Sequence, residues 1–157
     1  MPKKRILLCE DDHSLNKMLS AFLQSQGFFV AKFDSADGAL GLGMEALKDF
    51  DVLLTDVEMP GTCGIELAGK LRSQSDELLI FLMSGHFVSP GIIHDLEAMF
   101  LSKPFLPSHL LAEIASQIQF NSNQDVLKLD YDCELDHPIK TKKASDWVAP
   151  AARSILT

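Results

Sequence analysis

Short apolar runs alternate with stretches of helical periodicity along the first 120 residues, and this alternation constrains the fold more than any other feature. A short, uninterrupted apolar run is typical of a strand that is buried on both faces of a parallel sheet. We therefore predict five strands, at residues 6–9, 28–31, 52–54, 78–83 and 99–101.

The stretches between these runs place apolar residues every three or four positions, which predicts helices that pack one face on the sheet. Gly27 would end the first helix, while Pro90 and Pro107 stand near the starts of the last two. The periodic stretches are 15–23, 36–47, 65–71, 92–96 and 110–118. Five alternating strands and helices predict a doubly wound (βα)5 α/β fold, whose chemistry lies at the carboxyl ends of the strands.

Charge and composition narrow the class of protein. The net charge of −8 lacks the basic footprint of nucleic-acid binding, so we expect no direct DNA binding by this chain. The longest apolar run has six residues, far short of the roughly 20 of a membrane-spanning helix. The basic start at 3–5 soon meets three acids, unlike a secretion signal. Three scattered cysteines form no CxxC pair, and we expect a cytoplasmic protein with reduced thiols.

The tail, residues 121–157, has a different pattern from the rest of the chain. We predict a domain at 1–120 followed by a C-terminal extension that starts with a linker at 121–124. Strict alternation of apolar and charged residues from Leu127 to Leu135 predicts an amphipathic strand. Two interpretations stay open. The strand pairs with a sheet edge, in one version across a homodimer, or the extension is a linker and the start of an effector region.

Acidic and polar side chains follow four of the predicted strands. Glu10, Asp11 and Asp12 follow the first strand and Asp56 follows the third, so Asp11, Asp12 and Asp56 would share one cleft. Carboxylates this close repel one another unless a cation joins them. A hard dication such as Mg²⁺ (or Mn²⁺) suits such oxygen ligands and leaves positions for phosphate oxygens.

Ser84 follows the fourth strand and Lys103 the fifth, and together they would complete a site for a phosphoryl group facing an aspartate. Four motifs carry a resemblance to a known family: Glu10-Asp11-Asp12, Leu53 to Gly61 around Asp56, Ser84-Gly85, and Lys103-Pro104-Phe105. With these motifs in order over about residues 4–120, the chain resembles the CheY-like receiver domains of two-component response regulators. The resemblance implies a flavodoxin-like sheet of order 2-1-3-4-5 and a phosphorylation-dependent switch rather than an enzyme.

The resemblance also implies a role for each site residue. Asp56 would accept a phosphoryl group from a sensor histidine kinase or phosphotransfer protein, with self-catalysed transfer and autodephosphorylation. Asp12 and Asp56 would bind the metal through carboxylates, Asp11 through a water, and Glu58 through its backbone carbonyl. Ser84 and Lys103 would hold the phosphoryl oxygens. Phe100 occupies the position of the switch aromatic, and a downstream protein target would read the changed surface.

Simpler interpretations remain open for several of these residues. Asp11 and Asp12 could cap the first helix, because aspartate is favoured there, and Phe100 could be a plain core aromatic. Glu58 and His86 occupy positions at which the family tunes phosphoaspartate hydrolysis. The Lys103-Pro104 bond could be cis, as is common in the family.

One departure from the family concerns the fourth helix. Ser84 and Lys103 are only 19 residues apart, which is shorter than usual and predicts a short or displaced helix after Pro90. Because that helix forms part of the family's output face, the signalling surface of this chain stays open.

Two other classes fit less well. A phosphatase of the haloacid dehalogenase type needs an aspartate and a threonine where Glu58 and Pro60 stand. A flavin or nucleotide binder needs a phosphate-cradling loop after the first strand, where three acids would repel phosphate.

Overall fold

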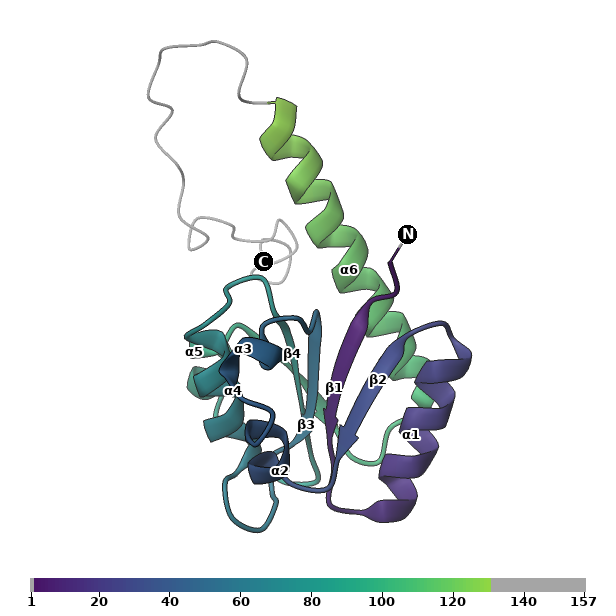
Figure 1. The fold of residues 1–157 in the computed structure, drawn as a ribbon, viewed down its shortest axis with the longest axis vertical. Coiled ribbons are helices and arrows are strands. Elements are labelled where there is room, and N and C mark those ends of the chain that lie inside the picture. The colour runs from purple at the N-terminus through teal and green to yellow at the C-terminus, as the bar shows by residue number, and fades with distance from the viewer. Residues whose placement is uncertain (1, 131–157) are drawn as a thin grey trace, which may run out of the picture. The chain divides into compact units, whose positions relative to one another are not determined.

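A computed structural model describes residues 2–130 of the chain. Its centre is a parallel sheet with the strand order β2-β1-β3-β4-β5 (Figure 1). The strands are β1 (Arg5–Cys9), β2 (Phe29–Phe33), β3 (Val52–Asp56), β4 (Leu79–Ser84) and β5 (Ala98–Ser102). The doubly wound flavodoxin-like fold and its predicted order are confirmed.

Helices cover both faces of this sheet (Figure 1). Side chains of a strand point alternately to opposite faces of the sheet, so each strand contributes residues to two apolar clusters. Leu53 and Leu82 belong to one cluster, and Leu54 and Phe81 to the other. The helices are α1 (His13–Ser25), α2 (Ala36–Leu40), α3 (Met44–Leu47), α4 (Gly64–Arg72), α5 (Pro90–Asp95) and α6 (Pro107–Asp130). The first cluster takes buried residues from α2, α3 and α4, and the second from α1 and α6.

The central strands are the most completely buried part of the fold. Every residue of β3 is buried, and four of the five residues of β1 are buried. Cys9 lies in this interior, where burial raises the pKa of its thiol to about 12, so it is a small apolar core residue. The carboxyl ends of β1 and β3 are therefore held rigidly side by side, with Cys9 paired to Thr55.

The predicted helix over 36–47 is two short helices in the structure. The break falls at 41–43, where Gly43 has a left-handed φ of 84°. Glycine adopts this conformation without the steric cost that other residues carry, so the chain turns there rather than continuing the helix. The helix predicted after Pro90 is confirmed as short, since α5 has six residues, and no residue of α5 is buried.

The C-terminal helix α6 differs from the sequence prediction. Residues 121–124 were predicted as a linker and 127–135 as a strand, but α6 continues to Asp130. After Pro107 the sequence holds no glycine, and no proline before Pro138, so nothing stops the helix. The rest of the predicted strand, 131–135, lies outside the described residues. Backbone contacts divide the chain into Met1–Phe120 and Asn121–Thr157, and the features below belong to the first unit.

Within residues 2–130, no helix combines the length and apolar character needed to cross a bilayer.

Candidate phosphoacceptor site

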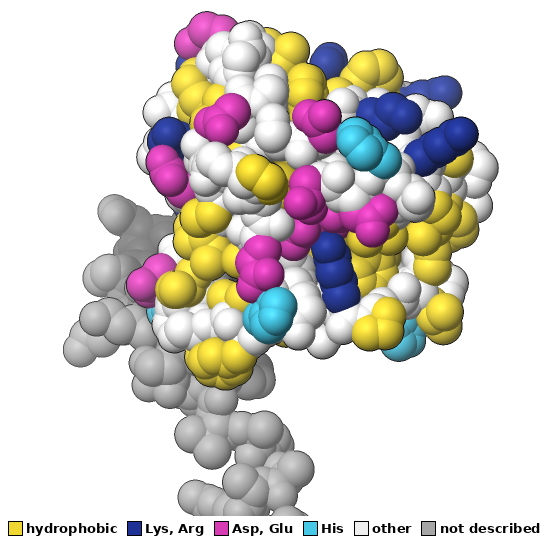
Figure 2. All heavy atoms as spheres, turned by 90° about the horizontal axis from the view of Figure 1, so that it is seen from below, with side chains coloured by type: hydrophobic (Ala, Val, Ile, Leu, Met, Phe, Trp, Pro, Cys, Tyr) yellow, Lys and Arg dark blue, Asp and Glu magenta, His cyan; other side chains and the backbone are white. Residues whose placement is uncertain are grey.

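An acidic cluster lies where β1 and β3 end side by side. Carboxylate oxygens of Glu10, Asp11 and Asp56 all lie within 4.8 Å of one another. Figure 2 shows this face from the carboxyl ends of the strands, with acidic side chains gathered near its centre beside a basic one. Parallel pairing of β1 with β3 brings these acids together although more than 40 residues separate them in the chain.

Lys103 joins two of these acids. Its Nζ lies 2.7 Å from Glu10 Oε2 and 3.2 Å from Asp56 Oδ2. Burial by itself would lower the pKa of Lys103, but the hydrogen bonds and negative charges of Glu10 and Asp56 raise it on balance. Lys103 therefore stays protonated at neutral pH and is a fixed positive charge at the site.

Glu10 is the most deeply buried acid of the cluster, with no exposed surface. Besides Lys103, it accepts a hydrogen bond at Oε1 from the Asp12 backbone N–H, at 3.1 Å. Burial raises the pKa of Glu10, although the Lys103 hydrogen bond opposes this shift. From the sequence, Glu10 was part of the acidic motif after the first strand, but only Asp11, Asp12 and Asp56 were expected to share the cleft.

Asp56 is the last residue of β3 and is 6% exposed. Its Oδ1 accepts a 3.3 Å hydrogen bond from the Glu58 N–H, and its Oδ2 faces Lys103. Burial raises the pKa of Asp56 most, and a side-chain hydrogen bond with Asp11 raises it further. The carboxylate is thus held at one edge by a fixed cation, close to the Asp11 carboxylate, in a partly desolvated position.

Asp12 does not lie in the cluster, although the sequence analysis predicted it as a metal ligand. Its Oδ1 accepts a 3.0 Å hydrogen bond from the Leu15 N–H and caps α1. This is the simpler interpretation that the sequence left open for it. The chain leaves the sheet at Glu10, so the side chains at 10 and 11 turn toward Asp56 and the third acid turns to the helix.

Ser84 ends β4 and is 1% exposed. Its Oγ accepts a 2.9 Å hydrogen bond from the His86 N–H, and its carbonyl accepts one of 2.8 Å from the Lys103 N–H. The second bond ties the segment after β5 to the end of β4. His86 Nδ1 lies 2.8 Å from Glu58 Oε1, which links the loop after β4 to the loop after β3.

Phe100 lies on edge strand β5 and is 36% exposed, so it is not an enclosed core residue. Its strand partner is Leu82, and the alternation of side chains places Phe100 and Ser84 on the same face of the sheet. The Lys103-Pro104 bond is cis, as expected.

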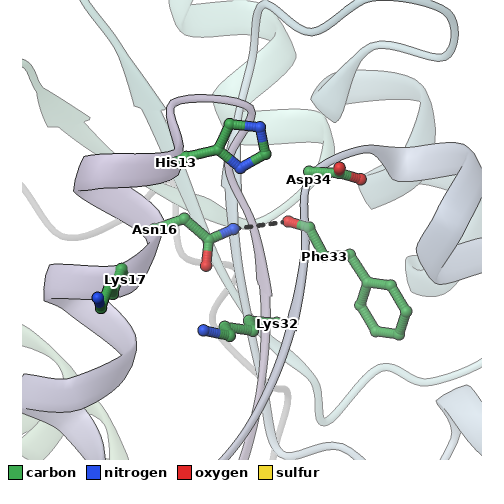
Figure 3. A pocket seen from close by; sticks show the side chains of 6 residues that line it. All are labelled: His13, Asn16, Lys17, Lys32, Phe33 and Asp34. Atoms are coloured by element: carbon green, nitrogen blue, oxygen red, sulfur yellow. Dashed lines mark hydrogen bonds between the residues drawn. The ribbon is translucent and has the colours of Figure 1, made fainter.

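A separate hollow lies beside the site, between α1 and the end of β2 (Figure 3). Asn16 lines it and donates through Nδ2 to the carbonyls of Glu10 (2.9 Å) and Phe33 (2.8 Å). Figure 3 shows the amide oxygen pointing to the side where Lys17 and Lys32 lie. Asn16 thus fixes the Glu10 backbone through its carbonyl. None of the three acids of the cluster lines this hollow.

The fold and this polar edge together define a CheY-like signalling domain. The family described as the response regulator receiver domain matches residues 6–115, well over half of the chain. The chain therefore belongs to the receiver domains of two-component systems, whose members are phosphoacceptors and bind Mg²⁺ at an acidic pocket.

Curated relatives agree with this assignment. The response regulator receiver protein CpdR of Brucella abortus is 35% identical over 118 residues, which cover 73% of this chain and 97% of CpdR. The transcriptional regulatory protein FixJ of Bradyrhizobium diazoefficiens is 36% identical over 125 residues, which cover 74% of this chain. The chain spans only 58% of the length of FixJ.

Solved structures show the same fold. The chemotaxis protein CheY4 of Vibrio cholerae is 29% identical, with a TM-score of 0.65, and the match covers 73% of this chain and 98% of CheY4. The receiver domain of the hybrid histidine kinase CckA is 26% identical, with a TM-score of 0.62, over 72% of this chain and 97% of that domain.

Proposed function

We propose that Asp56 is the phosphoacceptor of this receiver domain. The observation that carries the proposal is the Asp56 carboxylate itself, held 3.2 Å from the Lys103 ammonium beside Asp11. A carboxylate oxygen of Asp56 would attack the phosphorus of a phosphohistidine on a partner kinase or phosphotransfer protein. The new O–P bond forms as the N–P bond breaks, and the imidazole leaves and takes up a proton.

Lys103 and Ser84 would hold the transferred group. The Lys103 ammonium already faces Asp56 and would balance the added negative charge of the phosphoryl group. The Ser84 hydroxyl, at the end of the neighbouring strand, would donate to a phosphoryl oxygen. The test is incubation with acetyl phosphate and Mg²⁺, followed by mass spectrometry that locates the phosphoryl group on one peptide.

The chemistry of the donor set fits Mg²⁺. Three carboxylates gather within 4.8 Å, and hard oxygen ligands are those that Mg²⁺ prefers. We assign direct binding to Asp11 and Asp56, with the Glu58 carbonyl as a further ligand, and Glu10 as a neighbour that orients Lys103. The bound metal would neutralise charge that develops on the phosphoryl oxygens. Asp12 is left out of this set because its carboxylate caps α1.

Phosphorylation would act as a switch through Ser84 and Phe100. Ser84 would move toward the phosphoryl group, and the half-exposed Phe100 ring, on the same face of the sheet, would turn into the space that it leaves. A coupling of about 1–3 kcal/mol would suffice to bias such an equilibrium. The changed surface would be read by a downstream protein partner.

Further parts of the proposal concern the setting of the protein. We also propose a cytoplasmic location and no direct DNA binding by this chain. For residues 121–157 two proposals stand: they form a homodimer, or they lead into an appended effector region. Light scattering of the chain with and without 121–157 tests the homodimer, since an unchanged oligomeric state would remove that proposal.

Replacing each of the neighbouring acids Asp11 and Asp12 by alanine tests the assignment of metal ligands. We expect Asp11→Ala to weaken Mg²⁺ binding by about tenfold or more, because it removes a carboxylate from the cluster. Asp12→Ala should leave Mg²⁺ affinity within about twofold but lower the free energy of unfolding by about 1 kcal/mol, because it removes the cap of α1. Calorimetric Mg²⁺ titration and urea unfolding measure the two effects. Equal loss of Mg²⁺ affinity in both variants would return Asp12 to the ligand set.

Protons should compete with the metal at this site at a higher pH than at an ordinary carboxyl cluster. The pKa values of Glu10 and Asp56 are both raised by burial, so these groups take up protons above the usual carboxyl range of about 4. We expect Mg²⁺ affinity to fall about tenfold between pH 7.5 and about pH 5, at constant ionic strength. Calorimetric titration at both pH values measures this, with circular dichroism to show that the protein stays folded. Constant affinity over this range would contradict the raised pKa values.

A further inference from the structure

A carboxylate from α2 holds the turn that connects β3 to α4. Asp37 Oδ1 accepts a 2.6 Å hydrogen bond from the Thr62 hydroxyl, and Oδ2 accepts one of 3.3 Å from the Thr62 backbone N–H. The two residues are 25 positions apart and meet because α2 and α4 lie beside each other (Figure 1). One side chain therefore holds both donors of Thr62.

The backbone of this turn is shaped to admit the carboxylate. Gly61 has a left-handed φ of 81°, and a Cβ added there would overlap Asp37 Oδ2. The turn thus brings its bare backbone against the carboxylate, which a side chain at position 61 would prevent. The Thr62 hydrogen bonds also lower the pKa of Asp37, so the charged form is the one that the turn binds.

The turn leads directly to the phosphoacceptor. Gly64, the first residue of α4 and two residues after Thr62, packs so closely on β3 that a Cβ there would overlap the Asp56 carbonyl oxygen. Its N–H donates to the Val57 carbonyl at 3.0 Å, and the Thr55 hydroxyl donates to the same Asp56 carbonyl at 2.9 Å. The backbone of Gly64 lies directly against the backbone of Asp56, with no flexible side chain between them. A shift of Thr62 would therefore displace Asp56 as well.

We propose that Asp37 is a positioning residue for the phosphoacceptor, which fixes the entry of α4 and thereby the backbone of Asp56. The inference rests on the proposed function of Asp56. The Asp37–Thr62 contact lies on the surface. Asp37 therefore acts by holding the backbone in place and not by contact with the phosphoryl group. A small displacement of reacting groups can lower a reaction rate steeply, even when the change that causes it lies far from the chemistry.

The experiment compares four single variants and one double variant in the full chain. Asp37→Ala removes the acceptor, Thr62→Val removes the hydroxyl and keeps the backbone donor, and Thr62→Ser keeps both donors. Glu45→Gln is the charge control, because it removes one exposed acid of the separate helix α3, whose ion-pair partner is the C-cap residue Lys48. The measurements are Mg²⁺ affinity by calorimetry, the rate of phosphorylation by acetyl phosphate, and the thermal unfolding midpoint.

We expect Asp37→Ala to lower the phosphorylation rate and Mg²⁺ affinity by about fivefold, Thr62→Val by about twofold, and Thr62→Ser and Glu45→Gln to match the unchanged protein. The Asp37→Ala/Thr62→Val double variant should be no worse than Asp37→Ala alone, because both changes remove one interaction. Unfolding midpoints should stay within a few degrees of the unchanged protein.

Two results would overturn the proposal. The first is that Asp37→Ala binds Mg²⁺ and is phosphorylated as well as Glu45→Gln. The second is that the rate losses of Asp37→Ala and Thr62→Val add fully in the double variant. Failure of the proposed function looks different, because the unchanged protein would then bind Mg²⁺ yet accept no phosphoryl group at Asp56. In that case the Mg²⁺ affinities of the variants still decide whether Asp37 positions the site.

Discussion

Asp56→Asn is expected to abolish phosphorylation of the protein by acetyl phosphate. Asparagine keeps the size of the side chain, but its amide lacks the anionic oxygen that would form the bond to phosphorus. We expect the rate to fall by at least about 10³-fold, with no phosphorylated peptide from the end of β3. Time-resolved mass spectrometry of the intact protein and its peptides provides the measurement.

The same variant has a second, opposite signature in stability. Asp56 is buried and its pKa is raised, so its negative charge is unfavourable at neutral pH relative to a neutral amide. We therefore expect Asp56→Asn to remain folded and at least as stable as the unchanged protein near pH 7. Asp34→Asn, an exposed acid in the loop after β2, is the matched control and should phosphorylate normally. Phosphorylation that persists at another residue in Asp56→Asn would place the acceptor elsewhere.

Lys103→Ala should have the second largest effect, on both function and stability. The change leaves the buried Glu10 without its 2.7 Å partner and Asp56 without the cation at 3.2 Å. We expect phosphorylation to slow by about 10²-fold, because no ammonium balances the phosphoryl charge. The free energy of unfolding should fall by about 2 kcal/mol at pH 8, which allows for the partial exposure of Lys103.

The pH dependence of this loss follows from the direction of the pKa shifts. The pKa of Glu10 is already raised in the folded protein, and removal of Lys103 raises it further. Ionised Glu10 therefore destabilises the variant at pH 8, and stability returns as the pH falls through the raised pKa and Glu10 takes up a proton. In the unchanged protein the pKa of Lys103 is raised, so its contribution to stability is complete below the ordinary lysine pKa of about 10 and is lost only as the pH rises beyond that through the raised pKa of the folded state.

Urea unfolding of Lys103→Ala and Lys103→Arg at about pH 5 and pH 8 measures this dependence. Arginine keeps the charge but not the compact ammonium geometry, so it should retain most of the stability and lose most of the rate. Equal stability of Lys103→Ala and the unchanged protein at pH 8 would show that Glu10 does not depend on Lys103.

The structure places predicted site residues together where residue type and strand end coincide. Asp56, Ser84 and Lys103 each end or follow a strand whose apolar run is clear in the sequence, and each lies at the carboxyl edge of the sheet. The arrangement differs from the prediction in the run of three acids after β1, where Glu10 lies in the cluster and Asp12 caps α1. Residue types could not say which of them faces Asp56, because that depends on where the chain turns from the sheet into α1.

The helices, too, divide into features that the sequence predicted and features that it did not. α1 and α5 were predicted from periodicity and from the residues that limit them, whereas the split at Gly43 and the extension of α6 to Asp130 were not. Alternation over 127–135 predicted a strand, yet a strand needs a neighbour to bond with, while a helix satisfies its backbone within itself. Once α6 has begun, continuing it costs less than starting a new element.

By itself, the order of apolar runs and polar ends along the chain determined the parallel sheet, its two covered faces and the edge at which the chemistry lies. Only the tertiary structure decided that Glu10 rather than Asp12 joins Asp11 and Asp56, and that Asp37 reaches Thr62 across two helices. The reason is that strand patterns follow from local periodicity, whereas the direction of a side chain beyond a strand end depends on contacts between residues far apart in the sequence.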